Sequence, residues 1–72
     1  MNQDDAILDI MKSEPLRAWG TPEIMERLFT DLRPWDVSAK RKYTHKRLTQ
    51  LEKYGAVRRS RLDRTTYWML VS

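Results

Sequence analysis

The chain has 72 residues, no cysteine, one histidine and a formal net charge of +4, a length that allows one domain over residues 1–72 with a small core. The lack of cysteine excludes disulfides and thiolate metal sites, and with a single histidine we expect neither a metal ion nor another cofactor. No apolar run approaches the ~20 residues of a membrane span, and the acidic N-terminus is unlike a signal peptide, so we expect a cytoplasmic protein without membrane contact.

Charge is divided unevenly between the two halves of the chain. Residues 1–32 hold three basic and seven acidic side chains, a net charge of −4, whereas residues 33–72 hold eleven basic and three acidic ones, a net charge of +8. Such polarity steers a polyanion towards the basic side. Ordinary solvated surface is the alternative, but the basic excess is concentrated on one expected helix and one expected hairpin.

A first helix is expected at about residues 4–13. Asp4 and Asp5 offer an N-cap and favourable charge at its start, and Pro15 prevents its continuation. The apolar side chains in between recur on one face: Ile7, Leu8, Ile10 and Met11. Residues 16–19 are partly apolar and could form a short third strand that pairs with a C-terminal hairpin.

A second helix is expected at about residues 22–30. Thr21 is a suitable N-cap, and Pro22 is well placed at the first helical position. Apolar side chains follow at helical spacing: Ile24, Met25, Leu28, Phe29 and Leu32. The pattern breaks at residues 33–35, so either this helix runs on to the end of the apolar pattern or the connection over residues 30–36 is enlarged.

A third helix is expected at about residues 37–54. At about 100° per residue, its buried stripe is Val37, Thr44, Leu48 and Leu51. The opposite face carries Lys42, Lys46, Thr49 and Lys53, flanked by Ala39, Tyr43, His45 and Gln50. Arg41 lies near the apolar stripe, where we expect its stem to pack along the surface. Gly55 ends the helix, because glycine tolerates the left-handed conformation of a helix end.

Two antiparallel strands are expected at about residues 56–61 and 66–71, joined by a polar turn at residues 62–65. The second strand alternates two sets of side chains: Tyr67, Met69 and Val71 on one face, Trp68 and Leu70 on the other. Both sets are apolar, so the sequence leaves the buried face of this strand open.

The order helix, short extended segment, helix, helix, hairpin resembles the winged helix-turn-helix family of DNA-binding domains. Residues 21–24 (TPEI) resemble the start of the family's second helix. Residues 48–57 (LTQLEKYGAV) resemble its common L-x-x-L-E-x-x-G-x-V ending of the third helix and entry to the hairpin, or wing. The resemblance covers nearly the whole chain and implies an α+β, mainly α, fold with three helices and a two-stranded wing. The family's turn before the third helix is often only a few residues, so residues 30–36 depart from the pattern.

The resemblance implies that the third helix enters the major groove of double-stranded DNA and that the wing touches the backbone or the minor groove. It implies the following DNA-binding candidates: Thr21, Ala39, Lys42, Tyr43, His45, Lys46, Thr49, Arg59, Arg61 and Arg64. Lys42 and Lys46 are flexible point charges that suit phosphates. Four residues suit either base edges or a role on the surface or in helix packing: Tyr43, His45, Thr49 and Gln50, whose amide suits adenine. The wing arginines suit phosphate contacts or, alternatively, the protection of an edge strand from aggregation.

We therefore expect sequence-specific binding of double-stranded DNA by a small transcriptional regulator, as a monomer or weak homodimer. The alternative is a winged-helix protein–protein interaction module in a larger nucleoprotein assembly, with a protein partner on the acidic half (residues 1–32). An enzyme is not expected, because no nucleophile–base pair, glycine-rich phosphate loop or metal cluster is recognisable. Trp19, Trp35 and Trp68 are expected in the core or at its boundary, not as a stacking platform for single strands.

Overall fold

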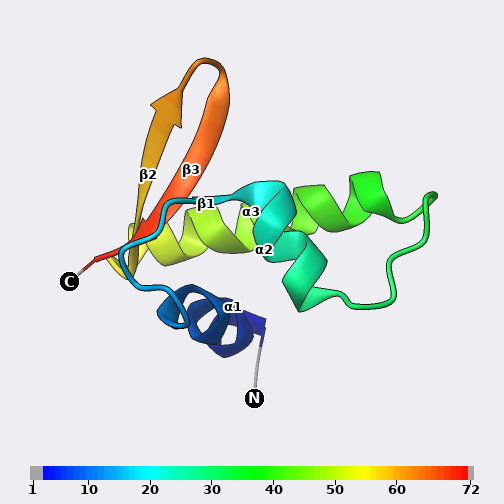
Figure 1. Cartoon of the computed structure of the whole chain (residues 1–72), viewed down its shortest axis with the longest axis horizontal. Coiled ribbons are helices and arrows are strands. Elements are labelled where there is room, and N and C mark those ends of the chain that lie inside the picture. Colours follow the sequence, from blue (N-terminus) through cyan, green and yellow to red (C-terminus); the bar gives the residue numbers. More distant parts are fainter. Residues whose placement is uncertain (1–2, 72) are drawn as a thin grey trace.

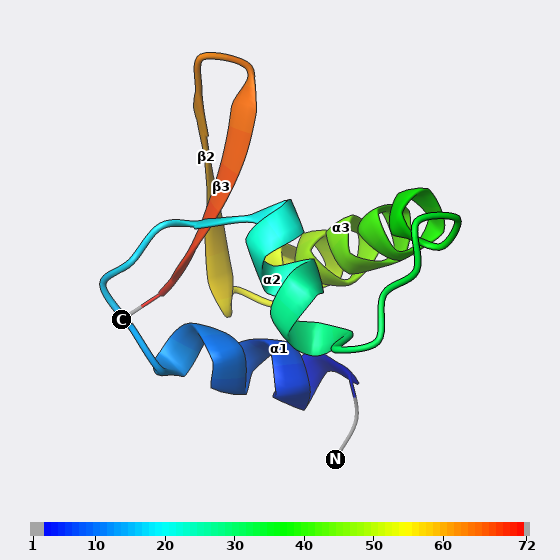
Figure 2. The same ribbon diagram turned by 45° about the vertical axis from the view of Figure 1, so that its right-hand side comes forward.

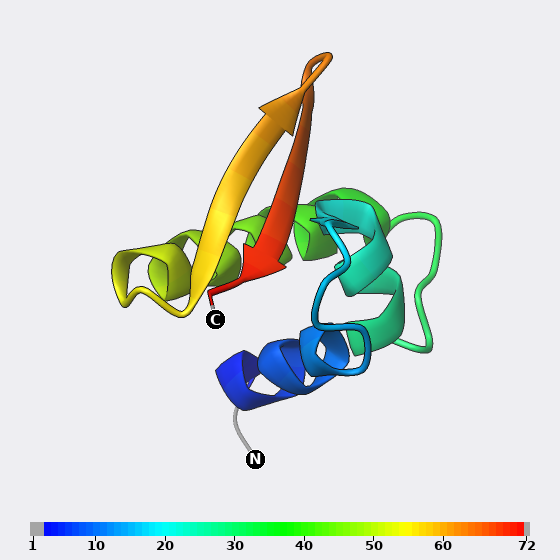
Figure 3. The ribbon, with the colours of Figure 1, turned by 60° about the vertical axis from the view of Figure 1, so that its left-hand side comes forward.

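The computed structural model describes residues 3–71, which form three helices and three strands (Figure 1). The elements in chain order are α1 (Gln3–Lys12), β1 (Trp19–Gly20), α2 (Thr21–Leu28), α3 (Val37–Lys53), β2 (Val57–Leu62) and β3 (Thr65–Leu70). The expected α+β, mainly α, fold with a winged-helix-like topology is confirmed. Both α1 and α2 pack against α3, and the hairpin rises from the C-terminal end of α3 (Figure 3).

β3 is the central strand of a three-stranded antiparallel sheet with the order β1-β3-β2. β2 and β3 form a hairpin that projects well beyond the helices (Figure 2). β1 has only two residues, and it pairs with the middle of β3, with Trp19 opposite Trp68 and Gly20 opposite Tyr67. The third strand expected near residues 16–19 is therefore present, but it begins at Trp19, and Leu16 is 90% exposed.

The hydrophobic core lies between the helices and the base of the hairpin. Its buried cluster consists of Ile7, Met11, Trp19, Ile24, Leu48, Leu51, Val57 and Trp68. Trp19 and Trp68 are both fully buried and share one face of the sheet, because directly paired residues of antiparallel strands point the same way. Trp68 thus marks the buried face of β3, which the sequence left open. Full burial of a large apolar side chain stabilises a fold by roughly 1.5–3 kcal/mol, so these two rings are major contributors.

Asp4, near the start of α1, is helical and forms an ion pair, so it does not act as the expected N-cap. Within the described residues α1 runs from Gln3, so Asp4 lies inside its first turn, where it supplies the expected acidic charge near the helix start. Its carboxylate accepts two hydrogen bonds from Arg47 on α3, 2.8 Å from Nε and 2.6 Å from Nη2. These hydrogen bonds, followed by the charge of Asp4, raise the pKa of the Arg47 guanidinium above its ordinary value. Arg47 therefore joins two helices.

The start of α2 also differs from the expectation. The N-cap is Gly20, and Thr21 is the first helical residue, so the prediction of Thr21 as the cap is wrong. The Glu23 carboxylate reaches back and accepts a hydrogen bond from the Gly20 backbone N–H over 3.1 Å, and it also pairs with Arg17. Thr21 is buried, and its Oγ1 instead accepts a hydrogen bond from the Trp68 indole Nε1 over 2.9 Å.

The connection between α2 and α3 is an enlarged loop over residues 29–36, because α2 ends at Leu28. Of the two alternatives that the sequence left open, the longer helix is wrong. The loop extends past the N-terminal end of α3, away from the core (Figure 1). Trp35 on this loop is 73% exposed, with the Arg33 guanidinium 5.6 Å from its ring centroid. Its expected place in the core or at its boundary is therefore also wrong.

α3 ends as the sequence predicts. Gly55 has a φ of +81°, its N–H donates to Glu52 O over 3.0 Å, and the Ala56 N–H donates to Leu51 O over 2.9 Å. This pair of bonds is a Schellman motif, which satisfies carbonyls of the last helical turn. Within α3, Leu51 is buried as expected, whereas Val37 at the first position is only half-buried because it adjoins the exposed loop.

The hairpin turn is tighter than expected. Leu62 pairs with Thr65, so the turn consists of Asp63 and Arg64 alone and not of four residues. Both have positive φ, +49° and +69°, as a two-residue type I′ turn requires. Asparagine, aspartate and glycine accept this region readily, whereas for other side chains the left-handed conformation costs about 1–2 kcal/mol. Arg64 is therefore strained at the tip of the hairpin.

Candidate nucleic-acid interface

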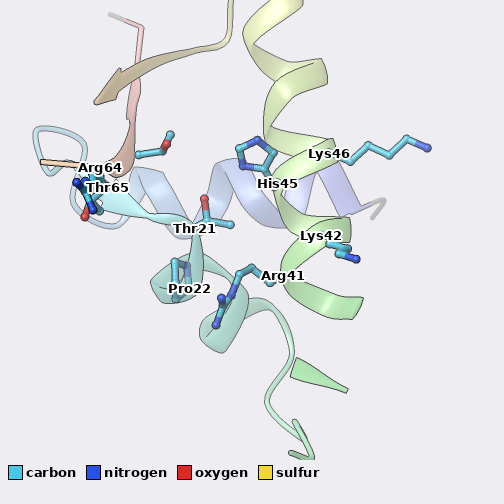
Figure 4. A pocket seen from close by; sticks show the side chains of 9 residues that line it. Thr21, Pro22, Arg41, Lys42, His45, Lys46, Arg64 and Thr65 are labelled. Carbon is cyan, nitrogen blue, oxygen red and sulfur yellow. The ribbon is translucent and has the colours of Figure 1, made fainter. Parts of the chain in front are cut away.

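A groove of about 460 Å³ lies between the start of α2, the exposed side of α3 and the tip of the hairpin (Figure 4). Its lining consists of Thr21, Pro22, Arg41, Lys42, His45, Lys46, Arg64, Thr65 and Thr66. We call it the basic groove, because four of these residues are lysine or arginine and, among residues 3–71, no acidic side chain lines it. Three segments that are distant in sequence thus surround one hollow, and two of them, α3 and the hairpin, place positive charge there.

Lys42 and Lys46 form the outer rim of the basic groove on α3. They are one turn apart, and the rise along the helix separates them by about 6 Å. Both are exposed, and in Figure 4 they extend from the opposite side of α3 to His45. Neither takes part in a salt bridge given for the described part of the chain. The expected exposed face of the third helix is therefore present with its two lysines available to solvent.

His45 connects the groove to the core. Its ring meets the buried Trp68 ring edge-on, with 5.5 Å between centroids and an interplanar angle of 72°. The Thr49 hydroxyl donates to the His45 carbonyl over 2.9 Å. His45 is exposed and lines the groove, whereas Thr49 is half-buried and does not line it. Thr21 lines it as well, but its hydroxyl accepts the Trp68 hydrogen bond.

Ala39 and Tyr43 lie on another side of α3. They line a separate hollow with Gln3, Phe29 and Lys40. The Tyr43 ring packs edge-on against Phe29, with 6.1 Å between centroids and 63° between planes. The sequence allowed two roles for Tyr43, base-edge contact or helix packing. The contact with Phe29 supports helix packing. The structure does not bring these two candidates into the basic groove.

The three wing arginines have different surroundings. Arg59 is held towards the body of the protein, with its Nε 3.6 Å from Glu52 Oε2 and its guanidinium 5.9 Å from the Trp68 ring centroid. Arg61 is exposed on the same face of the hairpin, opposite Thr66. Arg64 alone of the three lines the basic groove. The tip of the hairpin, and not its middle, faces α3 across the hollow.

Sequence reasoning missed four lining residues: Pro22, Arg41, Thr65 and Thr66. Arg41 was expected to pack along the surface, but it is exposed and lines the groove beside the start of α2. One signal could have identified it, since Arg41 and His45 are four residues apart and share a face of the helix. The two threonines had no such signal, because their place depends on the tight turn of the hairpin.

Comparisons with protein-family models, with curated proteins and with solved structures find no match for this chain. The functional argument therefore rests on the geometry and charge of the basic groove. In residues 3–71, no group of three or more histidine, cysteine or acidic side chains is arranged to hold a metal ion. No helix in that range has both the length and the apolar character needed to cross a membrane.

Proposed function

We propose that this protein binds double-stranded DNA sequence-specifically, as a small transcriptional regulator of the winged helix-turn-helix type. In this proposal α3 lies in the major groove, and the hairpin lies along the backbone or minor groove. The observation that carries it is that Arg41, Lys42 and Lys46 on α3 and Arg64 on the hairpin tip all line one groove, which has no acidic side chain among residues 3–71. A duplex carries a dense array of phosphates, which lysine and arginine side chains can neutralise.

The dimensions of the elements support this docking. α3 has 17 residues and is therefore about 25 Å long and, with side chains, about 10–12 Å across. The major groove of B-DNA is about 12 Å wide and admits a single helix. Each hairpin strand has six residues, or about 20 Å of extended chain. The hairpin can therefore reach the strand that borders the groove while α3 lies within it.

A charge-reversal experiment tests the proposal. The change is Lys42→Glu with Lys46→Glu, measured by fluorescence anisotropy against a labelled mixed-sequence duplex at several salt concentrations. We expect wild-type binding that weakens as salt rises, because neutralised phosphates release counterions, and we expect the double variant not to bind at micromolar protein. Circular dichroism should show that both proteins fold alike. Selection from random duplexes then measures sequence preference.

The matched control is Lys12→Glu with Arg58→Glu. Both residues are exposed, neither lines the basic groove, and the net charge changes by the same amount. If this pair weakens binding as strongly as the reversal on α3, general charge and not the groove governs affinity. Unchanged binding by the Lys42 and Lys46 variant would reject the docking of α3.

A protein–protein interaction module in a nucleoprotein assembly is the second candidate function. The observation in its favour is a set of exposed apolar side chains outside the basic groove: Leu16, Trp35 and Tyr54, which are 90%, 73% and 75% exposed. The acidic residues of α1 and α2 would favour a basic partner. Absence of duplex binding by the wild-type protein at micromolar concentration and moderate salt would favour this candidate.

A further inference from the structure

Arg64 occupies a position in the hairpin turn that its side chain does not favour. It follows Asp63 in a two-residue turn, and its φ of +69° lies in the left-handed region. Glycine at this position would form the same turn without strain. A strained residue outside glycine is a reason to look for a functional contact at that position. The guanidinium provides one candidate, since Arg64 is exposed and lines the basic groove.

The other residues of the groove indicate what Arg64 would hold. The α3 wall carries three cations, Arg41, Lys42 and Lys46, and the hairpin wall adds the hydroxyls of Thr65 and Thr66. Cations and hydroxyls are the groups that contact phosphate oxygens most often. No asparagine, glutamine, aspartate or glutamate lines the groove among the described residues, so the side-chain amides and carboxylates that read adenine and cytosine edges are missing from it.

We infer that the basic groove holds the sugar–phosphate backbone of a single strand of the duplex, and that Arg64 closes the groove over it from the hairpin side. The inference rests on the proposed function, and it assigns Arg64 to the phosphates, so that Arg64 adds affinity without sequence preference. Arg64 thus contributes affinity at the expense of the stability of the turn. The same residue should therefore shift folding and binding in opposite directions.

The substitution Arg64→Gly tests both parts in the full chain. The melting temperature should rise by about 2–8 °C, because relief of the strain in the turn outweighs the larger entropy that glycine loses on folding. Affinity for a 20-bp mixed-sequence duplex should fall about tenfold, as expected for the loss of a charge-assisted hydrogen bond to phosphate. The slope of log K against log salt should fall by about one, and a second duplex of unrelated sequence should lose affinity equally.

Three further variants serve as controls. Asp63→Gly changes the other residue of the turn, where aspartate already accepts a positive φ, and it removes no cation, so stability should change less than for Arg64→Gly while affinity stays equal or increases. Arg64→Lys retains the charge and the strain, so it should retain most of the affinity. Arg58→Gln removes the same charge from the opposite face of the hairpin, where Arg58 pairs with Met69, and should change affinity less than twofold.

The outcomes separate the two proposals. Lack of binding by the wild-type protein would reject the proposed function and this inference with it. Normal binding by wild type together with unchanged affinity of Arg64→Gly would reject only the inference. An equal loss for Arg58→Gln would also reject it, because the loss would then reflect net charge. A sequence-dependent loss for Arg64→Gly would assign Arg64 to base edges instead of the backbone.

Discussion

The indole Nε1 of Trp68 donates a hydrogen bond to Thr21 Oγ1 over 2.9 Å, and both residues are buried. Trp68 lies in the middle of the hairpin, and Thr21 begins α2. The bond therefore joins two of the three segments that surround the basic groove. His45, which packs against the Trp68 ring, adds the third. The shape of the exposed groove is thus determined by buried contacts beneath it.

Removal of that hydrogen bond should destabilise the fold. Thr21→Val preserves the shape of the side chain but leaves the buried Trp68 N–H without an acceptor, which should cost about 1–3 kcal/mol. Urea unfolding followed by circular dichroism measures the loss. Thr49→Val is the control, because the half-buried Thr49 hydroxyl bonds only to a backbone carbonyl of its own helix and leaves no buried donor unpaired when it is removed, and we expect less than about 0.5 kcal/mol there. Equal losses would contradict the role of the buried bond.

The end of α3 should not tolerate a side chain at Gly55. Gly55→Ala should cost about 1–2 kcal/mol, because φ is +81° and a left-handed conformation is unfavourable for alanine. Nothing lies within 4 Å of the added Cβ, so the effect would be conformational and not steric. Gly55→Asn should lose less, since asparagine accepts this region. Thermal unfolding of both variants measures the difference, and a larger loss for asparagine would refute this account.

Lys46 and Arg47 are neighbours with the same charge but should respond oppositely to neutralisation. Arg47→Gln should lower the melting temperature and leave duplex affinity unchanged, because the guanidinium is bound to Asp4. Lys46→Gln should leave the melting temperature unchanged and weaken duplex binding, with a salt slope smaller by about one. Calorimetry and anisotropy on the two variants make the comparison, in which each protein is the control for the other.

Substitution of the buried Trp68 and of the exposed Trp35 should affect stability very differently. Trp68→Ala should destabilise the protein by about 3–5 kcal/mol, enough to unfold a small domain, because the ring is fully buried. Trp35→Ala should change stability by less than about 0.5 kcal/mol, because its ring is 73% exposed. Iodide quenching of fluorescence offers a second readout, since Trp35 should account for the accessible emission. A large loss from Trp35→Ala would place this ring in a packed site.

The sequence predicts most clearly what depends on neighbours along the chain. The spacing of Thr44, Leu48 and Leu51 identifies the buried side of α3, and Gly55 identifies its end, because both follow from helix geometry alone. The short strand at Trp19 was also predictable, since an apolar segment before a turn can join an existing hairpin.

Contacts between distant segments were beyond the sequence. Thr21 is a good N-cap residue, yet its hydroxyl accepts a hydrogen bond from the Trp68 indole, and Gly20 occupies the cap position. Tyr43 has the helical phase of an exposed residue but meets Phe29, whose position depends on where α2 ends. Arg64 could be placed on the hairpin, but its place in the basic groove depends on a turn of two residues.

Because the hairpin projects beyond the helices, it is held at its base and free at its tip. The buried side chains of Val57 and Trp68 hold its lower part, and its free end carries Arg64, which precedes Trp68 by four residues, or about 13 Å of extended chain. A tilt of about 10° at the fixed end would displace the tip by roughly 2 Å over an arm of that length. Small changes in side-chain volume around Trp68 would therefore produce larger displacements of Arg64. The packing of the core would in this way adjust the distance between the hairpin tip and α3.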